Sequence, residues 1–341
     1  MKKPLRILVV MHPTLVPPDT LKGRTPEEIN VWKTEYDVVS NLRRLGHEVR
    51  ALGVQEELNP IRVAAEEWKP DVVFNLLEEF HGVSNFDQHV VAYLELLKLA
   101  YTGCNPRGLV LARSKAITKK IAAYHRVRVP AFVVAPRGRK VRRPKSLRFP
   151  LFVKSVSEEA SLGISQASIV ENDEKLSERV RFIHESIGSD ALVEEYIEGR
   201  ELYVGVIGNE RLRVLPTWEL DFGSLVESGE PIATARVKHS PEYQKKHHID
   251  IRRAGEMEPA LERLVQRTTR RVYRMLELDG YARVDYRLTA KGELYLLEAN
   301  PNPEIAEKEE FASAAAAAGL KYRALLSRIL GLALSRPGRL G

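Results

Sequence analysis

The sequence has very little cysteine and lacks any long apolar run. Cys104 is the one cysteine among 341 residues, which excludes a disulfide framework and any zinc or iron–sulfur site built on several cysteines. No window approaches the roughly 18 consecutive apolar residues that a membrane span requires, so no membrane segment or membrane partner is predicted. The short apolar segment after Lys2 and Lys3 is followed by no small-residue cleavage site, and we interpret it as a first β-strand. These absences lead us to expect a cytoplasmic protein.

Basic residues are in excess and unevenly distributed. The formal net charge is +7, and residues 137–148 alone hold seven lysines and arginines. Such a run is typical either of a surface for nucleic acids or anionic substrates, or of a solvated connection. Because no aromatic residue interleaves the run and no nucleic-acid motif accompanies it, we favour the solvated connection and do not expect a nucleic-acid partner.

The rest of the composition is that of a folded protein. The apolar fraction of 44% excludes overall disorder, and the length predicts two or three domains. In the first 110 residues, strands are predicted at 6–10, 48–53, 71–76 and 100–102, and helices at 25–45, 61–68 and 89–99. Thr25, Pro26 and Glu28 form a helix start with a capping box. This alternation predicts a parallel sheet covered on both faces.

The later residues are richer in predicted strands. These strands cover 131–135, 151–155, 163–170, 191–196, 201–207, 211–220, 281–288 and 293–299. Helices are predicted at 114–125, 174–187, 258–278 and 311–334, the last as a helix pair or one bent helix. Gly199 indicates a hairpin between the strands at 191–196 and 201–207. His247 and His248 are interpreted as part of a mobile loop. We therefore divide the chain into units 1–110, 111–190 and 191–341.

The segment from Tyr281 to Ala299 is the most informative part of the sequence. If Lys291 and Gly292 form a two-residue turn, the numbers of opposed residues sum to 583. Side chains alternate between the two faces of a sheet. One face then carries three apolar pairs as a core: Val284 with Ala299, Tyr286 with Leu297, and Leu288 with Tyr295. The other face carries a polar cluster: Asp285 opposite Glu298, and Arg283 opposite Asn300.

Two directly opposed acids destabilise a sheet unless something neutralises them. A divalent cation between Asp285 and Glu298 would do so, and carboxylate and amide oxygens favour Mg²⁺ or Mn²⁺ over zinc. The alternative is that Arg283 neutralises both acids in a solvated ion-pair network. At this point both interpretations remain open.

Two further segments are compatible with a nucleotide. Lys154 ends a strand and precedes a small-residue loop with Ser161 and Gly163, an arrangement that can bind phosphates through an ammonium group and backbone N–H groups. No Walker sequence is present, and a turn with an exposed lysine is the alternative. The apolar strand leading to Tyr196 ends in acids, which could contact an adenine and a ribose, or could simply be a partly exposed strand.

In this order, the motifs resemble the ATP-grasp enzymes of the D-alanine–D-alanine ligase type. The resemblance rests on Val193–Glu201 (Val-Glu-Glu-Tyr-Ile-Glu-Gly-Arg-Glu) and on Ala-Arg-Val-Asp-Tyr and Leu-Glu-Ala-Asn-Pro within residues 282–301, and it extends from about residue 6 to 330. It implies an α/β ATP-grasp fold, with an N-terminal Rossmann-like parallel-sheet domain followed by central and C-terminal α+β domains.

The resemblance also implies which residues bind ATP. Lys115 and Lys154 would contact its phosphates, and Ser161 and Gly163 would lie in a flexible loop covering them. The remaining nucleotide contacts would come from Glu194, Glu195, Tyr196 and Ile197 at the adenine, and from Glu201 at the ribose.

Metal and catalytic roles follow from the same resemblance. Asp285, Glu298 and Asn300 would bind two Mg²⁺ ions, with Glu298 bridging them. Arg283 would stabilise the oxyanion of a tetrahedral intermediate, and Lys238 would belong to a closing loop. The substrate-side candidates are His81, Glu27, His239 and Glu309.

The implied reaction is an ATP- and Mg²⁺-dependent ligation of a small-molecule carboxylate to an amine. The γ-phosphoryl group moves to the carboxylate, an amine attacks the resulting acyl phosphate, and phosphate leaves. The resemblance also allows a homodimer. The alternatives are an ATP-dependent carboxylase or phosphoryl-transfer relative, which bicarbonate dependence would reveal, and an ATP-binding module without turnover.

The chain departs from the family pattern around its substrates. The family's Gly-Gly-x-Ser-x-Glu-His-Glu start is absent, and Glu27 or Glu28 is the candidate replacement for its acid. After Asn300, where the family has a serine that receives a carboxylate, this chain has Glu307, Glu309 and Glu310. Because acids repel a carboxylate, we expect an amine substrate other than plain D-alanine. The alternative is that these glutamates face water at a helix start.

Overall fold

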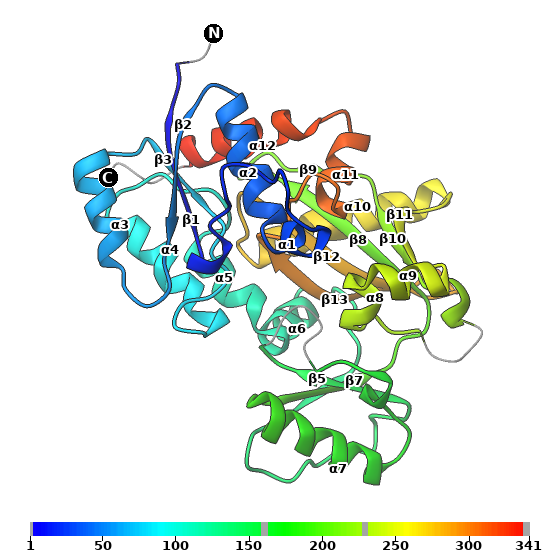
Figure 1. The fold of residues 1–341 in the computed structure, drawn as a ribbon. Coiled ribbons are helices and arrows are strands. Elements are labelled where there is room, and N and C mark those ends of the chain that lie inside the picture. Colours follow the sequence, from blue (N-terminus) through cyan, green and yellow to red (C-terminus); the bar gives the residue numbers. More distant parts are fainter. Residues whose placement is uncertain (1–2, 158–162, 227–230, 337–341) are drawn as a thin grey trace.

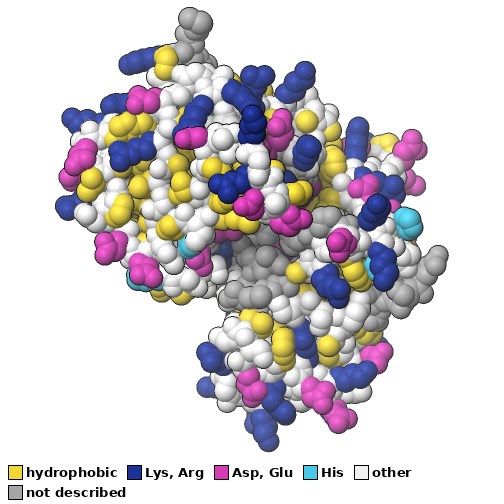
Figure 2. Space-filling model, in the orientation of Figure 1, with side chains coloured by type: hydrophobic (Ala, Val, Ile, Leu, Met, Phe, Trp, Pro, Cys, Tyr) yellow, Lys and Arg dark blue, Asp and Glu magenta, His cyan; other side chains and the backbone are white. Residues whose placement is uncertain are grey.

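The computed structural model describes residues 3–157, 163–226 and 231–336, which form three β-sheets with flanking helices (Figure 1). The α/β fold class predicted above is confirmed. One lobe, built on a four-stranded sheet, projects away from the other two sheets (Figures 1 and 2). Among the described helices, none combines the length and the apolar character needed to cross a membrane.

The N-terminal sheet is parallel, as the alternation of strands and helices predicts. Its order is β2 (Glu48–Gly53), β1 (Arg6–Met11) and β3 (Val72–Asn75). The predicted strand at 100–102 is reduced to one bridge between Tyr101 and Val73. The accompanying helices are α1 (Pro26–Val31), α2 (Lys33–Arg44), α3 (Asn59–Val63), α4 (Asp87–Leu96) and α5 (Pro106–Arg113). The capping box of Thr25 and Glu28 is present, but the helix predicted through residue 45 is interrupted at Trp32.

The C-terminal end of the chain returns to this first sheet. The predicted segment 311–334 is a helix pair, α11 (Glu310–Ala317) and α12 (Tyr322–Leu334). Leu325 and Ile329 of α12 share a buried core with Ile7 and Val9 of β1. The two ends of the chain therefore stabilise one another through apolar burial.

The central sheet is antiparallel, in the order β4 (Phe132–Ala135), β7 (Ala191–Glu195), β5 (Leu151–Ser155) and β6 (Ile169–Val170), with α7 (Asp173–Phe182) packed against it. The strand predicted from Gly163 shortens to two residues. The predicted division after residue 190 falls inside this sheet, since β7 lies between β4 and β5. The basic residues 137–148 connect β4 to β5 and are mostly exposed, with Arg143 paired to Asp173.

The hairpin predicted at Gly199 is wrong. β7 pairs with β4 and β5 in the central sheet, whereas β8 (Arg200–Ile207) belongs to the C-terminal sheet. Gly199 has φ 146°, and a Cβ there would lie 2.2 Å from the Leu288 carbonyl oxygen. The glycine therefore marks a sharp crossing between two sheets. The sequence prediction failed here because a local turn pattern carries no information about which strands pair.

The C-terminal sheet has the order β11 (Asp250–Arg253), β10 (Trp218–Asp221), β8, β12 (Tyr281–Leu288) and β13 (Leu294–Pro301), with β9 (Arg213–Val214) beside β8. The long helix α10 (Pro259–Met275) packs on it. The loop interpretation at His247 is wrong: Thr234 and Ser240 cap two short helices, α8 (Ala235–His239) and α9 (Pro241–His247).

The predicted β12–β13 pairing is correct at its polar end and wrong at its turn end. Asp285 lies opposite Glu298, and Arg283 lies opposite Asn300. Nearer the turn, Tyr286 pairs with Leu296 instead of Leu297, and Leu288 pairs with Leu294 instead of Tyr295. The last backbone hydrogen bond of the hairpin joins Thr289 to Glu293, so the turn is one residue longer than the predicted two-residue turn. A bulge after Asp285 offsets this extra residue and restores the predicted pairing at the polar end.

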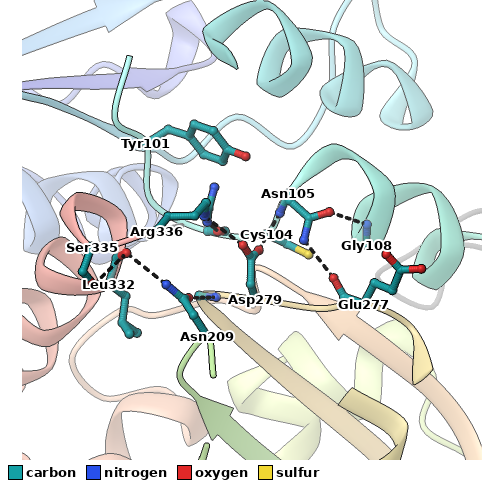
Figure 3. Close-up of polar contacts among 12 residues, drawn as sticks. Tyr101, Cys104, Asn105, Gly108, Asn209, Glu277, Asp279, Leu332, Ser335 and Arg336 are labelled. Atoms are coloured by element: carbon teal, nitrogen blue, oxygen red, sulfur yellow. Dashed lines mark hydrogen bonds and ion pairs between the residues drawn. The ribbon is translucent and has the colours of Figure 1, made fainter. Parts of the chain in front are cut away.

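A polar network joins the N-terminal unit to the loop that precedes β12 (Figure 3). The Asn105 backbone N–H donates to one Asp279 oxygen at 2.7 Å, and Arg336 Nε pairs with the other at 2.8 Å. The Arg336 guanidinium also lies 4.1 Å from the ring centroid of Tyr101. This network helps to hold β12 in position.

The crossing at Gly199 generates a stability prediction. Gly199→Ala should lower the free energy of unfolding by about 3 kcal/mol or more, because the methyl group meets a backbone carbonyl in a glycine-only conformation. Gly292→Ala is the matched control: its φ is 77° and nothing lies within 4 Å of an added Cβ, so a loss of about 1 kcal/mol is expected. Urea unfolding of both variants measures the difference, and equal losses would contradict the crossing.

Candidate active site

The two antiparallel sheets enclose a cavity of about 320 Å³. Strands β5 and β7 contribute from the central sheet, and β8, β12 and β13 contribute from the C-terminal sheet. A pocket of this volume between two units, with apolar walls and several charged groups, is a usual setting for a small-molecule site.

Most of the predicted site residues line this cavity. They are Lys115, Lys154, Glu194, Glu195, Tyr196, Ile197, Glu201, Lys238, Arg283, Asp285, Glu298, Asn300 and Glu309. His81 instead lies in an exposed turn, and Glu27 lies in the exposed first turn of α1. Gly163 precedes the lining residue Ile164. Ser161 lies outside the described residues, and so does the side chain of His239.

Glu194 is buried between two lysines. Its carboxylate lies 2.9 Å from Lys154 Nζ and 2.9 Å from Lys119 Nζ. Burial alone would raise the pKa of Glu194, but the two ammonium groups lower it, so the carboxylate is ionised. Lys154 is therefore a buried ion-pair partner rather than an exposed lysine at a turn.

Lys119 is a residue that the sequence analysis missed. It lies in α6 (Lys115–Tyr124), four residues after Lys115, and its side chain is fully buried. Besides pairing with Glu194, it donates to the Leu296 carbonyl oxygen of β13 at 3.3 Å. Burial lowers the pKa of Lys119 to about 8, against the attraction of Glu194. The spacing of one helical turn from Lys115 is the signal that could have revealed it.

Asp285 is almost fully buried and held from two sides. Arg283 binds it with both Nε and Nη2, at 2.8 and 2.9 Å, and Asn300 Nδ2 donates to it at 3.0 Å. Burial raises the pKa of Asp285 despite Arg283. The second ion-pair partner of Arg283 is Glu310, so within the described residues Arg283 acts on Glu298 only at longer range.

Glu298 faces lysines instead. It forms an ion pair with Lys115, whose Nζ lies 3.8 Å from Oε2. Burial would raise the pKa of Glu298, but Lys115, Lys154, Lys238 and Arg283 together lower it to about 2. At neutral pH the side chain is therefore a carboxylate anion.

The chemistry of this face fits a magnesium site. Asp285 and Glu298 each offer a carboxylate, and Asn300 has its Oδ1 available as an acceptor while its Nδ2 donates to Asp285. These are hard oxygen donors. Within the described part of the chain, no group of three or more His, Cys, Asp or Glu side chains is arranged to hold a metal. The candidate magnesium ligands are therefore two carboxylates and one amide: Asp285, Glu298 and Asn300.

Arg287 holds the part of the cavity lining that contains Glu201. It pairs with Glu201 at 2.9 Å and donates to the carbonyl oxygens of Gly199 and Pro231. Tyr203 donates to the other Glu201 oxygen at 2.9 Å. Arg287 was also missed, although it shares one face of β12 with Arg283 and Asp285 by simple alternation.

The comparisons with known proteins agree with this geometry. The family described as D-ala D-ala ligase C-terminus matches residues 117–331. This chain belongs to the D-alanine–D-alanine ligase family. It is 34% identical over 265 residues to the uncharacterized protein y4sG of Sinorhizobium fredii, covering 78% of this chain and 75% of that one. It is 29% identical over 309 residues to the D-alanine–D-alanine ligase of Aquifex aeolicus, covering 90% and 97%.

Solved structures show the same fold. The D-alanine–D-alanine ligase of Bacillus anthracis complexed with ATP has a TM-score of 0.73 at 23% identity, covering 97% of both chains. The VanG D-Ala:D-Ser ligase of Enterococcus faecalis has a TM-score of 0.71 at 19% identity, covering 97% of this chain and all of that one. The predicted family and ATP-grasp fold are thereby confirmed, and the chain is a carboxylate–amine ligase by family.

The buried lysine generates a second stability prediction. Lys119→Met should lower the free energy of unfolding by about 3 kcal/mol, because Glu194 loses one of its two buried cations. Lys120→Met is the control, since Lys120 is the exposed neighbour on the same helix, and a change within about 0.5 kcal/mol is expected. Denaturant titration of both variants at pH 7 tests this, and equal losses would argue against the buried cluster.

Glu35 generates a prediction on pH. Burial, together with Glu78 and Glu304, raises its pKa to about 7 from 4.5. The folded state therefore retains this proton more strongly, and the group destabilises the protein progressively as pH rises from about 4.5 to 7. Glu35→Gln should stabilise by roughly 3 kcal/mol at pH 8 and have little effect at pH 4.5. Urea unfolding of both proteins between pH 4.5 and 8 measures the difference in their free energies of unfolding. A difference that does not change with pH would contradict the prediction.

Proposed function

We propose that this protein uses ATP and Mg²⁺ to join a carboxylate to an amine through an acyl phosphate, with an amine substrate other than plain D-alanine. The observation that carries the proposal is one cavity in which buried lysines meet the facing acids Asp285 and Glu298. Cationic side chains beside paired hard-oxygen donors are what a metal-bound triphosphate requires.

The nucleotide would extend along the cavity from Tyr196 and Ile197 to the lysines. Glu201, held by Arg287 and Tyr203, stands where ribose hydroxyls could donate to it. Lys115, Lys154 and Lys238 would contact the phosphates, since all three line the cavity. Because Lys115 already lies 3.8 Å from Glu298 and Lys154 and Lys238 also attract it, little reorganisation would accompany the build-up of phosphate charge.

Asp285, Glu298 and Asn300 would hold the magnesium ions. When bound, the metal neutralises charge on the transferring phosphoryl group. The substrate carboxylate then attacks the γ-phosphorus, the bond to the ADP oxygen breaks, and an acyl phosphate forms. The amine nitrogen attacks the acyl carbon, the bond to the phosphate oxygen breaks, and the nitrogen loses a proton.

Arg283 would face the oxygen that becomes negative during the second step. Its guanidinium is fixed by Asp285 on one side and by Glu310 on the other, and it lies 4.8 Å from the ring centroid of Tyr203. A donor held in this way is already oriented before charge develops. Glu310 is then a positioning residue for Arg283.

The substrate end supports an amine other than D-alanine. Glu304 and Glu309 line the cavity and act electrostatically on one another, and like charges disfavour a free carboxylate at that position. Glu307, which the sequence placed with them, is exposed and does not line the cavity.

The test is phosphate release with ATP, Mg²⁺ and pooled amino acids and dipeptides, with the product identified by mass spectrometry. Glu298→Gln should reduce release at least roughly hundredfold, because the metal site loses a charged ligand. Glu174→Gln, on the exposed face of α7, should leave release unchanged. Full release by Glu298→Gln, or release that persists in excess EDTA, would refute the metal-dependent mechanism.

A further inference from the structure

The cavity is lined by lysines and by a separate group of glutamates. Lys115, Lys154 and Lys238 act on Glu298, whereas the group that we call the acidic end includes Glu310, the partner of Arg283, and comes from two separate segments. Its members are Glu78, Glu304, Glu309 and Glu310. Glu78 follows β3, and the other three lie between β13 and the start of α11, so tertiary packing assembles this acidic end.

Protein cations neutralise only part of the acidic end. Arg283 pairs with Glu310, and Lys33 pairs with Glu309. Glu304 is exposed, accepts a hydrogen bond from the Thr34 hydroxyl at 3.2 Å and is attracted by Lys33, but it forms no ion pair within the residues that the structure describes. Glu309 and Glu310 thus each have an ion-pair partner, whereas Glu304 has a neutral donor and a more distant cation.

The buried carboxylate of Glu35 adds to the negative charge around this end. Glu35 is 7% exposed in the first turn of α2. Within the described residues, no cation and no side-chain donor is paired with it. The side chains that act on it electrostatically are Glu78 and Glu304, both of which line the cavity. Burying a carboxylate beside other acids is unfavourable, and a positive group in the cavity would offset that energy.

We propose, given the ligase function above, that the amine substrate carries a second, non-reacting cationic group that binds this acidic end against Glu304 and Glu309. The substrate class is a diamine or a basic amino acid. Its reacting amine would then face the acyl phosphate near Arg283, while the second ammonium group supplies the positive charge that the glutamates lack.

Matched pairs of acceptors test the charge requirement. Phosphate release with ATP, Mg²⁺ and pooled carboxylates is measured with 1,4-diaminobutane against butylamine, and with lysine against norleucine, in both stereochemical forms for the amino acids. We expect kcat/KM to be about tenfold or more higher for the dicationic member, as for a charged hydrogen bond. D-alanine is included as the carboxylate-bearing competitor.

Conservative variants assign that preference to the acidic end. Glu304→Gln and Glu309→Gln should each lower the ratio of kcat/KM for 1,4-diaminobutane to kcat/KM for butylamine about tenfold. Glu307→Gln is the control, because Glu307 lies on the same segment, is exposed and does not line the cavity, so the preference should persist. Calorimetric titration of 1,4-diaminobutane and butylamine, with ADP and Mg²⁺ present, measures the same preference without turnover.

The outcomes separate this inference from the function on which it rests. Release that favours butylamine or D-alanine, or a preference that survives both glutamine variants, overturns the cationic substrate and leaves the ligase intact. No release with any acceptor, together with selective and Glu304-dependent binding of the diamine, supports the cation subsite and refutes the ligase. No selective binding and no selective release refutes the subsite.

Discussion

The cavity depends on one buried electrostatic cluster, the carboxylate of Glu194 held between Lys119 and Lys154. Two like-charged ammonium groups can be buried side by side here because the anion between them compensates for part of their lost hydration. Lys119 also binds the Leu296 carbonyl oxygen, so the cluster connects α6 and the central sheet to β13. The two sheets that enclose the proposed nucleotide site are thereby fixed relative to one another.

The ionisation of Glu298, one of the opposed acids of β12 and β13, depends partly on Lys154 of this cluster. Glu298 remains ionised because the lysines around it outweigh its burial, whereas burial raises the pKa of the neighbouring Asp285. The bulge after Asp285 has a second effect. It moves Leu297, which regular alternation assigns to the core, into the lining of the cavity. An apolar side chain thus lies beside the paired acids and lowers their exposure to water.

The same cavity explains why family membership does not by itself define the substrate. Under the proposed function, its lysines would meet the demands of a triphosphate. Its acidic end combines Glu78, which follows β3, with residues of the β13–α11 connection. Under the proposed function, the choice of amine would therefore depend on segments that are distant in sequence.

The sequence by itself determined the local features. These include the strands β1, β2, β5 and β12 and the capping box at Thr25, because caps and strands depend on neighbours within a few residues. The facing of Asp285 and Glu298 was predicted too, but it depends on the bulge that offsets the longer turn. Only the tertiary structure decided that Gly199 crosses between sheets, that Lys119 is buried against Glu194, that Glu35 lies behind Glu78 and Glu304, and that His81 stays outside the cavity. Each of these depends on which distant segments pack together, and that choice is made by the burial of whole faces rather than by any local pattern.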